Sequence, residues 1–209
     1  MRLKEKAILV AHKQHGTDKR KGTDTLYITH PIEVGLILEK MNCSDETVIA
    51  GILHDTLEDT AYTDEALKAE FGQSVLDIVK GCSEPSKKLS WITRKKHTCE
   101  YLKTAPKEVR AVSLADKLQN ILSIKADFDI LGDDLWERFN AGKHHQAWYY
   151  KELIKSLKPT TDDFPGYVAI YNEYKEVVEE VFKWENKPNV ERNRKLVIMP
   201  EENSENCEE

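Results

Sequence analysis

Residues 51–60, GILHDTLEDT, decide the fold, because here an apolar triplet runs directly into a histidine and three carboxylates. If this segment is helical, His54 lies beside Glu58 and Asp55 lies beside Asp59, since residues four apart are neighbours on a helix surface. Uncompensated buried charges are costly. A segment that begins like a core helix and ends in a dense polar patch therefore indicates a functional site.

Helical periodicity dominates the sequence on both sides of this stretch, and no segment shows a convincing strand-like alternation. The apolar spacing predicts helices over residues 3–15, from Asp45 into the motif, over 89–102, and from Pro106 onward. A long helix is predicted from just after Gly132 to about residue 157. The sequence therefore predicts an all-α fold.

Several residues mark expected helix boundaries. Proline is favoured at the first helical position, so Pro31 is expected to open a helix with His30 at its cap. Thr63 is expected to cap the following helix through its side chain. Gly72 and Gly81 are expected to separate the segments after it.

The composition limits the classes of function. The chain has 209 residues, of which 40% are hydrophobic and 33% charged, and a net charge of −6. This charge argues against a nucleic-acid partner, although a local basic cluster can still bind a small anion. No apolar run reaches the length of a membrane span, and the first residues lack the features of a signal peptide. We expect a cytoplasmic protein without a membrane partner, and the sequence leaves the oligomeric state open.

The cysteines do not indicate a disulfide framework or a zinc knuckle. The four residues are scattered, and no pair has the CxxC spacing. Reduced thiols are therefore expected, as in cytosolic proteins. The cysteines are Cys43, Cys82, Cys99 and Cys207.

A set of metal-capable residues comes from three predicted helices: His30, the pair His54 and Asp55, and Asp116. Two imidazoles and two carboxylates suit manganese, iron or another first-row divalent ion better than calcium or a structural zinc ion. Four protein ligands leave positions on a six-coordinate ion for water and a phosphate oxygen. Metal-assisted hydrolysis requires such open positions.

The ordered motifs resemble those of the HD superfamily. They are YITHP at 27–31, GILHDTLEDT at 51–60, FG at 71–72 and LADKLQN at 114–120. More narrowly, residues 3 to about 157 are similar to the hydrolase domain of Rel/SpoT proteins. The small stand-alone alarmone hydrolases, including the metazoan SpoT homologue, share this pattern.

This resemblance implies a compact HD-domain helical bundle that binds one manganese ion per chain. The implied activity is removal of the 3′-pyrophosphate from the guanosine alarmones ppGpp and pppGpp, which gives GDP or GTP and pyrophosphate. The implied metal ligands are His30, His54, Asp55 and Asp116.

Further residues acquire expected roles beside this metal site. Glu58 and Asp59 are one turn beyond the ligands, where two carboxylates can position and deprotonate the attacking water. The alternative for this pair is a solvated helix end capped by Thr60. By the resemblance, Arg20 and Lys21 lie near the guanine nucleotide.

The motif at 114–120 carries one further contact and one departure from the family. The resemblance implies that Asn120 contacts the nucleotide. Gln119 stands where the family usually has histidine, and Lys117 is expected to be a surface charge. The basic run 94–96 either meets the pyrophosphate or forms a solvated helix face.

Two alternative functions and a domain division remain predictions. The chain is alternatively an HD phosphohydrolase acting on another nucleotide, such as the 2′-phosphate of NADPH or a deoxynucleotide. It is alternatively a non-enzymatic module that binds an alarmone and signals. We expect a hydrolase domain over residues 1–157, then a linker with an amphipathic helix packed on or beside it over 158–199. An acidic, disordered tail is expected over 200–209.

Overall fold

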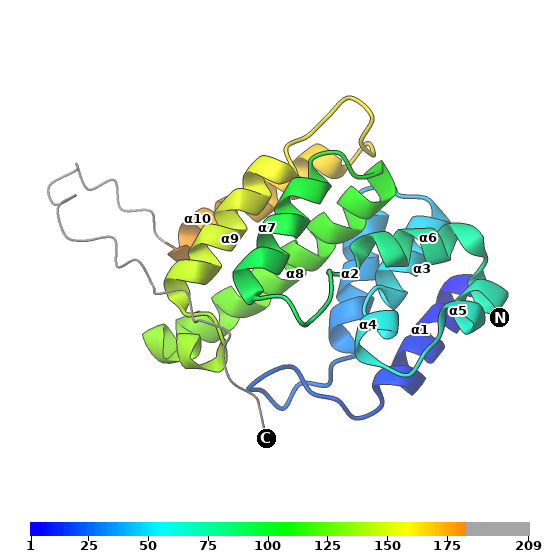
Figure 1. The fold of residues 1–209 in the computed structure, drawn as a ribbon, viewed down its shortest axis with the longest axis horizontal. Helices are drawn as coiled ribbons and strands as arrows, with labels where there is room; N and C mark the ends of the chain where they lie inside the picture. Colours follow the sequence, from blue (N-terminus) through cyan, green and yellow to red (C-terminus); the bar gives the residue numbers. More distant parts are fainter. Residues whose placement is uncertain (183–209) are drawn as a thin grey trace, which may run out of the picture.

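The computed structural model describes residues 1–182, and all regular elements in this range are helices (Figure 1). The predicted all-α class is therefore confirmed. The elements are α1 (Leu3–His15), α2 (Thr29–Lys40), α3 (Asp45–Leu53), α4 (Thr56–Asp59), α5 (Asp64–Phe71), α6 (Gln73–Cys82), α7 (Trp91–Leu102), α8 (Lys107–Leu131), the 3₁₀ helix η1 (Gly132–Arg138), α9 (Lys143–Ser156) and α10 (Tyr167–Phe182). The tail predicted to be disordered lies outside the described residues.

Helix α8 is the central element of the bundle (Figure 1). It packs against α2, α3 and α6, and also along α10, so it joins the two halves of the chain. Its residues Leu114, Leu118 and Ile121 are almost wholly buried, and burying such a side chain stabilises the fold by about 1.5–3 kcal/mol. Because α8 is covered on several sides, it can hold polar side chains deep inside the molecule.

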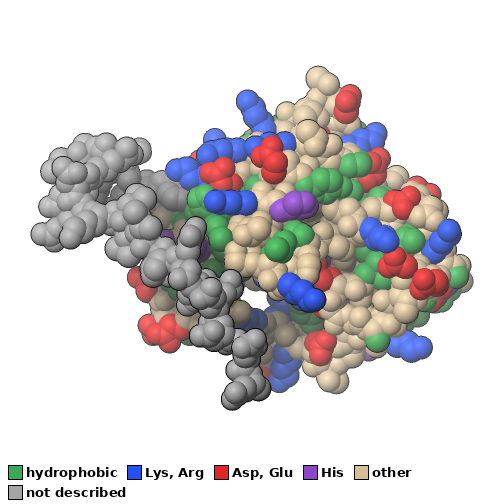
Figure 2. All heavy atoms as spheres, viewed as in Figure 1, with side chains coloured by type: hydrophobic (Ala, Val, Ile, Leu, Met, Phe, Trp, Pro, Cys, Tyr) green, Lys and Arg blue, Asp and Glu red, His purple; other side chains and the backbone are tan. Residues whose placement is uncertain are grey.

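The surface is charge-rich and mixed in sign. On the face drawn in Figure 2, acidic and basic side chains of the described residues are interspersed with small apolar patches. Within residues 1–182, no helix combines the length and the apolar character needed to cross a bilayer.

The helix expected to run through GILHDTLEDT is interrupted at its centre. Helix α3 ends at Leu53, and α4 begins only at Thr56. The ring of His54 contacts the carbonyl of Gly51 through Nδ1 at 2.8 Å, and the Thr56 hydroxyl donates to the carbonyl of Leu53 at 2.7 Å. These side chains bind carbonyls at the end of α3, so the backbone turns at His54 and Asp55.

Glycine allows α2 and α3 to approach closely beside this turn. A Cβ atom on Gly51 would lie 2.1 Å from Cδ1 of Leu38, a side chain of α2. Any larger residue would therefore require the buried Leu38 side chain or α3 itself to shift.

Three predicted boundaries are wrong. Helix α2 begins at Thr29, so His30 lies inside the first turn and not at the cap. Gly81 lies within α6, where a Cβ would come 2.6 Å from Cγ2 of Val109, so its role is close packing and not a break. The helix predicted over 132–157 is divided into η1 and α9, because Phe139 after η1 has extended backbone (φ −99°, ψ 136°).

Two other predicted boundaries are confirmed. The Thr63 hydroxyl caps α5 by accepting from the backbone N–H of Ala66 at 3.2 Å. Gly72 separates α5 from α6 with φ of +93°, a conformation that favours glycine. The predicted amphipathic helix after the linker is α10, whose buried face belongs to the same core as the rest of the bundle.

Candidate metal centre and its two cavities

The tight centre of the site consists of His30, His54 and Asp116, from α2, the end of α3 and α8. One potential ligand atom from each of these residues lies within 4.8 Å of the others. Nε2 of His30 lies 3.3 Å from Oδ1 of Asp116, and Nε2 of His54 lies 3.8 Å from the same oxygen. Both imidazoles are buried. Among the described residues, the fold thus converges three elements on one point.

Asp55, the fourth predicted ligand, lies beside this triad. Its Oδ2 is 3.0 Å from Nε2 of His54 and 3.6 Å from Nε2 of His30. The same oxygen accepts a hydrogen bond from the hydroxyl of Tyr27. The structure therefore brings all four predicted ligands together.

The histidine orientations fit a metal ion. His54 Nδ1 faces a backbone carbonyl, which only accepts, so the ring proton belongs on Nδ1 and the Nε2 lone pair points to the centre. This buried Nε2 makes no hydrogen bond in the structure. An unprotonated imidazole nitrogen aimed at two carboxylates lacks a partner that a divalent cation supplies.

The electrostatics of the centre also favour a cation. Burial lowers the pKa of His54, but the neighbouring carboxylates of Asp55 and Asp116 outweigh it and raise the pKa well above its usual value, so positive charge at Nε2 is favoured, whether a proton or a metal ion supplies it. Burial raises the pKa of the Asp55 carboxyl, but positive charge on His54 and the neighbouring His30 hold it well below its usual range. The two carboxylates therefore stabilise positive charge at this point, and a divalent ion satisfies the same requirement.

The centre opens into a cavity of about 240 Å³ between α4, α7 and α8, which we name the α7 cavity. His54, Asp55 and Asp116 line it, together with both carboxylates of the predicted acidic pair. The Glu58 carboxylate accepts from the backbone N–H of Glu84 at 3.3 Å, and Asp59 pairs with the exposed Lys87 at 3.0 Å. Exposed ion pairs contribute at most about 1 kcal/mol, so Lys87 does not lock Asp59 in place.

Cations also line part of the α7 cavity wall. Lys117 was predicted to be a surface charge, and this prediction is wrong. Its side chain is largely buried, with Nζ 2.6 Å from Oδ2 of Asp116. Burial lowers its pKa, but the Asp116 charge outweighs this effect and raises the pKa well above the usual value. Arg94 and Lys95 also line this wall and pair with Glu84, whereas Lys96 is exposed.

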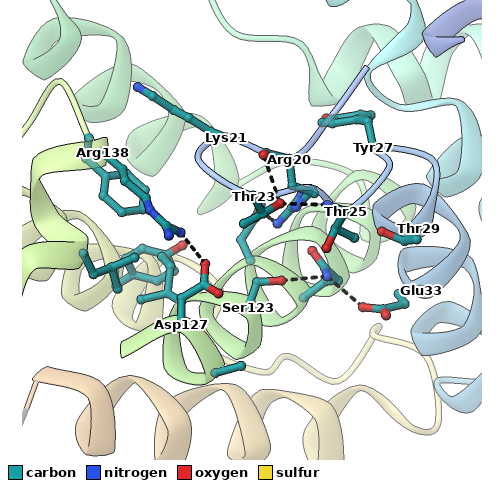
Figure 3. Close-up of a pocket in the computed structure, with 17 residues that line it drawn as sticks. Arg20, Lys21, Thr23, Thr25, Tyr27, Thr29, Glu33, Ser123, Asp127 and Arg138 are labelled. Carbon is teal, nitrogen blue, oxygen red and sulfur yellow. Dashed lines mark hydrogen bonds and ion pairs between the residues drawn. The ribbon is translucent and has the colours of Figure 1, made fainter. Parts of the chain in front are cut away.

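A larger cavity of about 550 Å³ lies between the 16–28 loop, α2, α8 and η1, and we name it the α2 cavity (Figure 3). Both members of the predicted Arg20–Lys21 pair line it. Arg20 donates to Oδ1 of Asn120 at 2.9 Å, whereas the exposed Lys21 reaches Asn140 at 3.3 Å. Asn120 in turn donates to Oδ1 of Asp116 at 2.5 Å.

Three side chains line the α2 cavity and also bond to the metal centre: Tyr27, Gln119 and Asn120. We name this set the partition. The partition connects a cavity rich in hydroxyls and amides to the cluster that opens on the α7 cavity. The partition therefore separates the α2 cavity from the predicted metal ligands and contacts both.

The match to known families covers most of this architecture. The model of the HD domain family matches residues 7–143, which include most of α1, all of α2 to η1 and every residue of the centre. The chain belongs to the HD domain family. Family membership is consistent with a divalent metal ion at the His30, His54 and Asp116 cluster.

Curated HD relatives carry names that concern guanosine alarmones. A Haemophilus influenzae protein named guanosine-3′,5′-bis(diphosphate) 3′-pyrophosphohydrolase is 39% identical over 104 residues, which cover 47% of this chain and 15% of that protein. The chain therefore matches only a small part of the length of this relative.

Solved structures support the same fold over longer ranges. A Listeria monocytogenes protein is 35% identical with a TM-score of 0.66, and the match covers 75% of this chain and 96% of that chain. A metazoan orthologue of SpoT that hydrolyses ppGpp is 22% identical with a TM-score of 0.69, covering 86% of this chain and 96% of that one. At this identity, the second likeness concerns the fold alone.

The sequence missed some residues that the structure places at the site. Glu84 comes from a loop without a motif, and only the fold brings it to Arg94 and Lys95. Tyr149, from α9, lines the α7 cavity, although its place in the aromatic run 148–150 is typical of a core residue. Gln119 was visible only as a departure from the family pattern.

Proposed function

We propose that this chain removes the 3′-pyrophosphate from guanosine alarmones, giving GDP or GTP and pyrophosphate. The observation that carries the proposal is the position of the His–Asp cluster between two unlike cavities. The α7 cavity combines carboxylates with cations, and the α2 cavity is large enough for a nucleoside. The printed name of the Haemophilus influenzae relative supports this choice of substrate.

We propose His30, His54, Asp55 and Asp116 as ligands of one manganese ion per chain. Their nitrogen and oxygen donors suit a first-row divalent ion. When bound, such an ion polarises a phosphoryl oxygen and lowers the pKa of a water molecule. The partition and the α3–α4 turn orient the four side chains.

Glu58 and Asp59 are proposed to position the attacking water and to accept its proton. Both carboxylates line the α7 cavity together with His54, Asp55 and Asp116. They belong to the short helix α4, which directly follows Asp55. The water oxygen attacks the phosphorus attached to the 3′ oxygen, and the bond between this phosphorus and the 3′ oxygen breaks. Pyrophosphate leaves with the added oxygen, and the 3′ oxygen takes up a proton.

The charges in the α7 cavity suit the leaving group. Arg94, Lys95 and Lys117 supply positive charge on the wall of the same cavity that the acidic pair lines. A pyrophosphate at this wall gains charge-assisted hydrogen bonds, which are stronger than neutral ones. The nucleoside then extends into the α2 cavity, where Arg20 and Asn120 are proposed to contact it.

We further propose residues 1–157 as the hydrolase domain. The linker and the helical segment that follow are proposed as an addition beside it, and residues 200–209 as an acidic tail. The metal ligands, the acidic pair and both cavities are formed by residues before position 158.

The test is a substrate comparison with purified, manganese-loaded protein. We expect rapid release of pyrophosphate from ppGpp and slow turnover of GTP, because the phosphates of GTP lie only on the 5′ side. If ppGpp is inert while NADPH or a deoxynucleotide is hydrolysed quickly, the substrate assignment is wrong. If ppGpp binds tightly and no substrate is turned over, the chain is a binding module.

A further inference from the structure

Gln119 lines the α2 cavity and contacts His30. It is buried in α8, and its Oε1 contacts Nδ1 of His30. Its Nε2 lies 2.7 Å from Oε2 of Glu33 and 3.1 Å from the hydroxyl of Ser123 (Figure 3). Glu33 and Ser123, which accept from this amide, both line the α2 cavity.

The chemistry of Glu33 decides the orientation of the Gln119 amide. A carboxylate accepts hydrogen bonds and donates none, so the NH₂ group of Gln119 must face Glu33. The opposite orientation would bring the carbonyl oxygen against the carboxylate and the NH₂ group against His30. Glu33 therefore leaves only the carbonyl oxygen of Gln119 to face the imidazole.

The orientation of the amide in turn decides which nitrogen of His30 carries the proton. A carbonyl oxygen is only an acceptor, so Nδ1 of His30 must donate to it. The other nitrogen, Nε2, then presents its lone pair to the centre, 3.3 Å from Oδ1 of Asp116. His54 reaches the same state through a backbone carbonyl, whereas His30 depends on a side chain.

We infer that Gln119, held by Glu33, is a positioning residue that fixes the proton of His30 on Nδ1 and directs Nε2 at the metal site. The inference rests on the divalent-ion site proposed above but not on the identity of the substrate. Partners of this kind, behind a metal-binding histidine, typically change metal affinity about 10- to 100-fold when they are removed.

The first experiment measures manganese affinity by calorimetry on Gln119→Leu. Leucine nearly preserves the side-chain volume and removes the acceptor, so we expect binding about 10- to 100-fold weaker than in the wild type. Gln146→Leu is the matched control, because Gln146, on α9, is also a buried glutamine but donates to the carbonyl of Ala141 before that helix and lines neither cavity. We expect this control to bind manganese like the wild type.

The second experiment exchanges the two polar groups in the double variant Glu33→Gln/Gln119→Glu. The amide at position 33 then donates to the carboxylate at position 119, which accepts from His30, and the net charge is unchanged. We expect manganese affinity to return to within about threefold of the wild type, well inside the loss expected for the leucine variant. A purely structural role for Gln119 does not predict this rescue.

The outcomes separate this inference from the proposed function. Wild-type affinity in Gln119→Leu overturns the inference, as does an exchange variant that folds but binds no better than the leucine variant. If Gln119→Leu does not fold, the exchange variant alone decides. Wild-type protein that binds manganese without hydrolysing ppGpp leaves the inference intact and refutes only the substrate assignment.

Discussion

The two cavities beside the metal centre differ in the kind of side chain that lines them. The α7 cavity contains the ligand carboxylates, the acidic pair and several cations, so charges of both signs lie close together. The α2 cavity has more hydroxyl, amide and apolar side chains. Of the carboxylates that line it, Asp127 pairs with Arg138 at 2.8 Å and Glu33 accepts from the Gln119 amide at 2.7 Å. Bond cleavage requires charged groups that stabilise the charge developing in the transition state, whereas binding a nucleoside requires a cavity of matching shape with hydrogen-bonding groups. We therefore propose that bond cleavage takes place in the α7 cavity and that the α2 cavity holds the nucleoside.

The largest effect is expected from the proposed metal ligands, three of which line the α7 cavity. Asp55→Ala and His54→Ala each remove a donor atom, so bound manganese and turnover should both fall by more than about 100-fold. Metal analysis of the purified variants, with calorimetry, measures the first quantity. Equal manganese content in Asp55→Ala and the wild type would overturn the metal assignment.

The acidic pair tests the chemical half of the comparison. Glu58→Gln with Asp59→Asn preserves the size of both side chains, so kcat for ppGpp should fall by about 100-fold or more. Manganese affinity and the melting temperature should stay close to those of the wild type. A near-normal kcat in this double variant would return the pair to a capping role at the end of α4.

The binding half of the comparison is tested at Arg20 and Asn120. Loss of hydrogen bonds to a charged substrate costs about 1.5–3 kcal/mol, so Arg20→Ala should raise KM about 10- to 100-fold with little change in kcat. Asn120→Ala should also weaken manganese binding, because Asn120 donates to Asp116. Steady-state kinetics and calorimetry together distinguish the two variants. If Arg20→Ala lowers kcat and leaves KM unchanged, the division between the cavities fails.

The smallest effect is expected at Lys21, the neighbour of Arg20 in the sequence. Lys21 is exposed, and within residues 1–182 its ammonium group donates a hydrogen bond to Asn140. Exposed contacts of this kind contribute little, so Lys21→Ala should change KM by only about twofold. A loss as large as that of Arg20→Ala would mean that both basic residues contact the nucleotide.

The sequence by itself determined the fold class and indicated the candidate metal ligands. Helical spacing is a local property, so the all-α class could be read from apolar periodicity alone. The resemblance of residues 27–31, 51–60 and 114–120 to the HD superfamily indicated which histidines and aspartates to combine. The structure places these residues around one point, as expected.

Only the tertiary structure decided how these residues are oriented and what surrounds them. The turn at His54 depends on side chains that bind the last carbonyls of α3, which no periodicity reveals. Lys117 has the sequence context of a surface lysine but is buried against Asp116, because α7 and α9 cover that side of α8. Gln119 acquires its role from Glu33, 86 positions away in the chain. Contacts between distant residues depend on helix packing, and packing is a property of the whole bundle rather than of any segment.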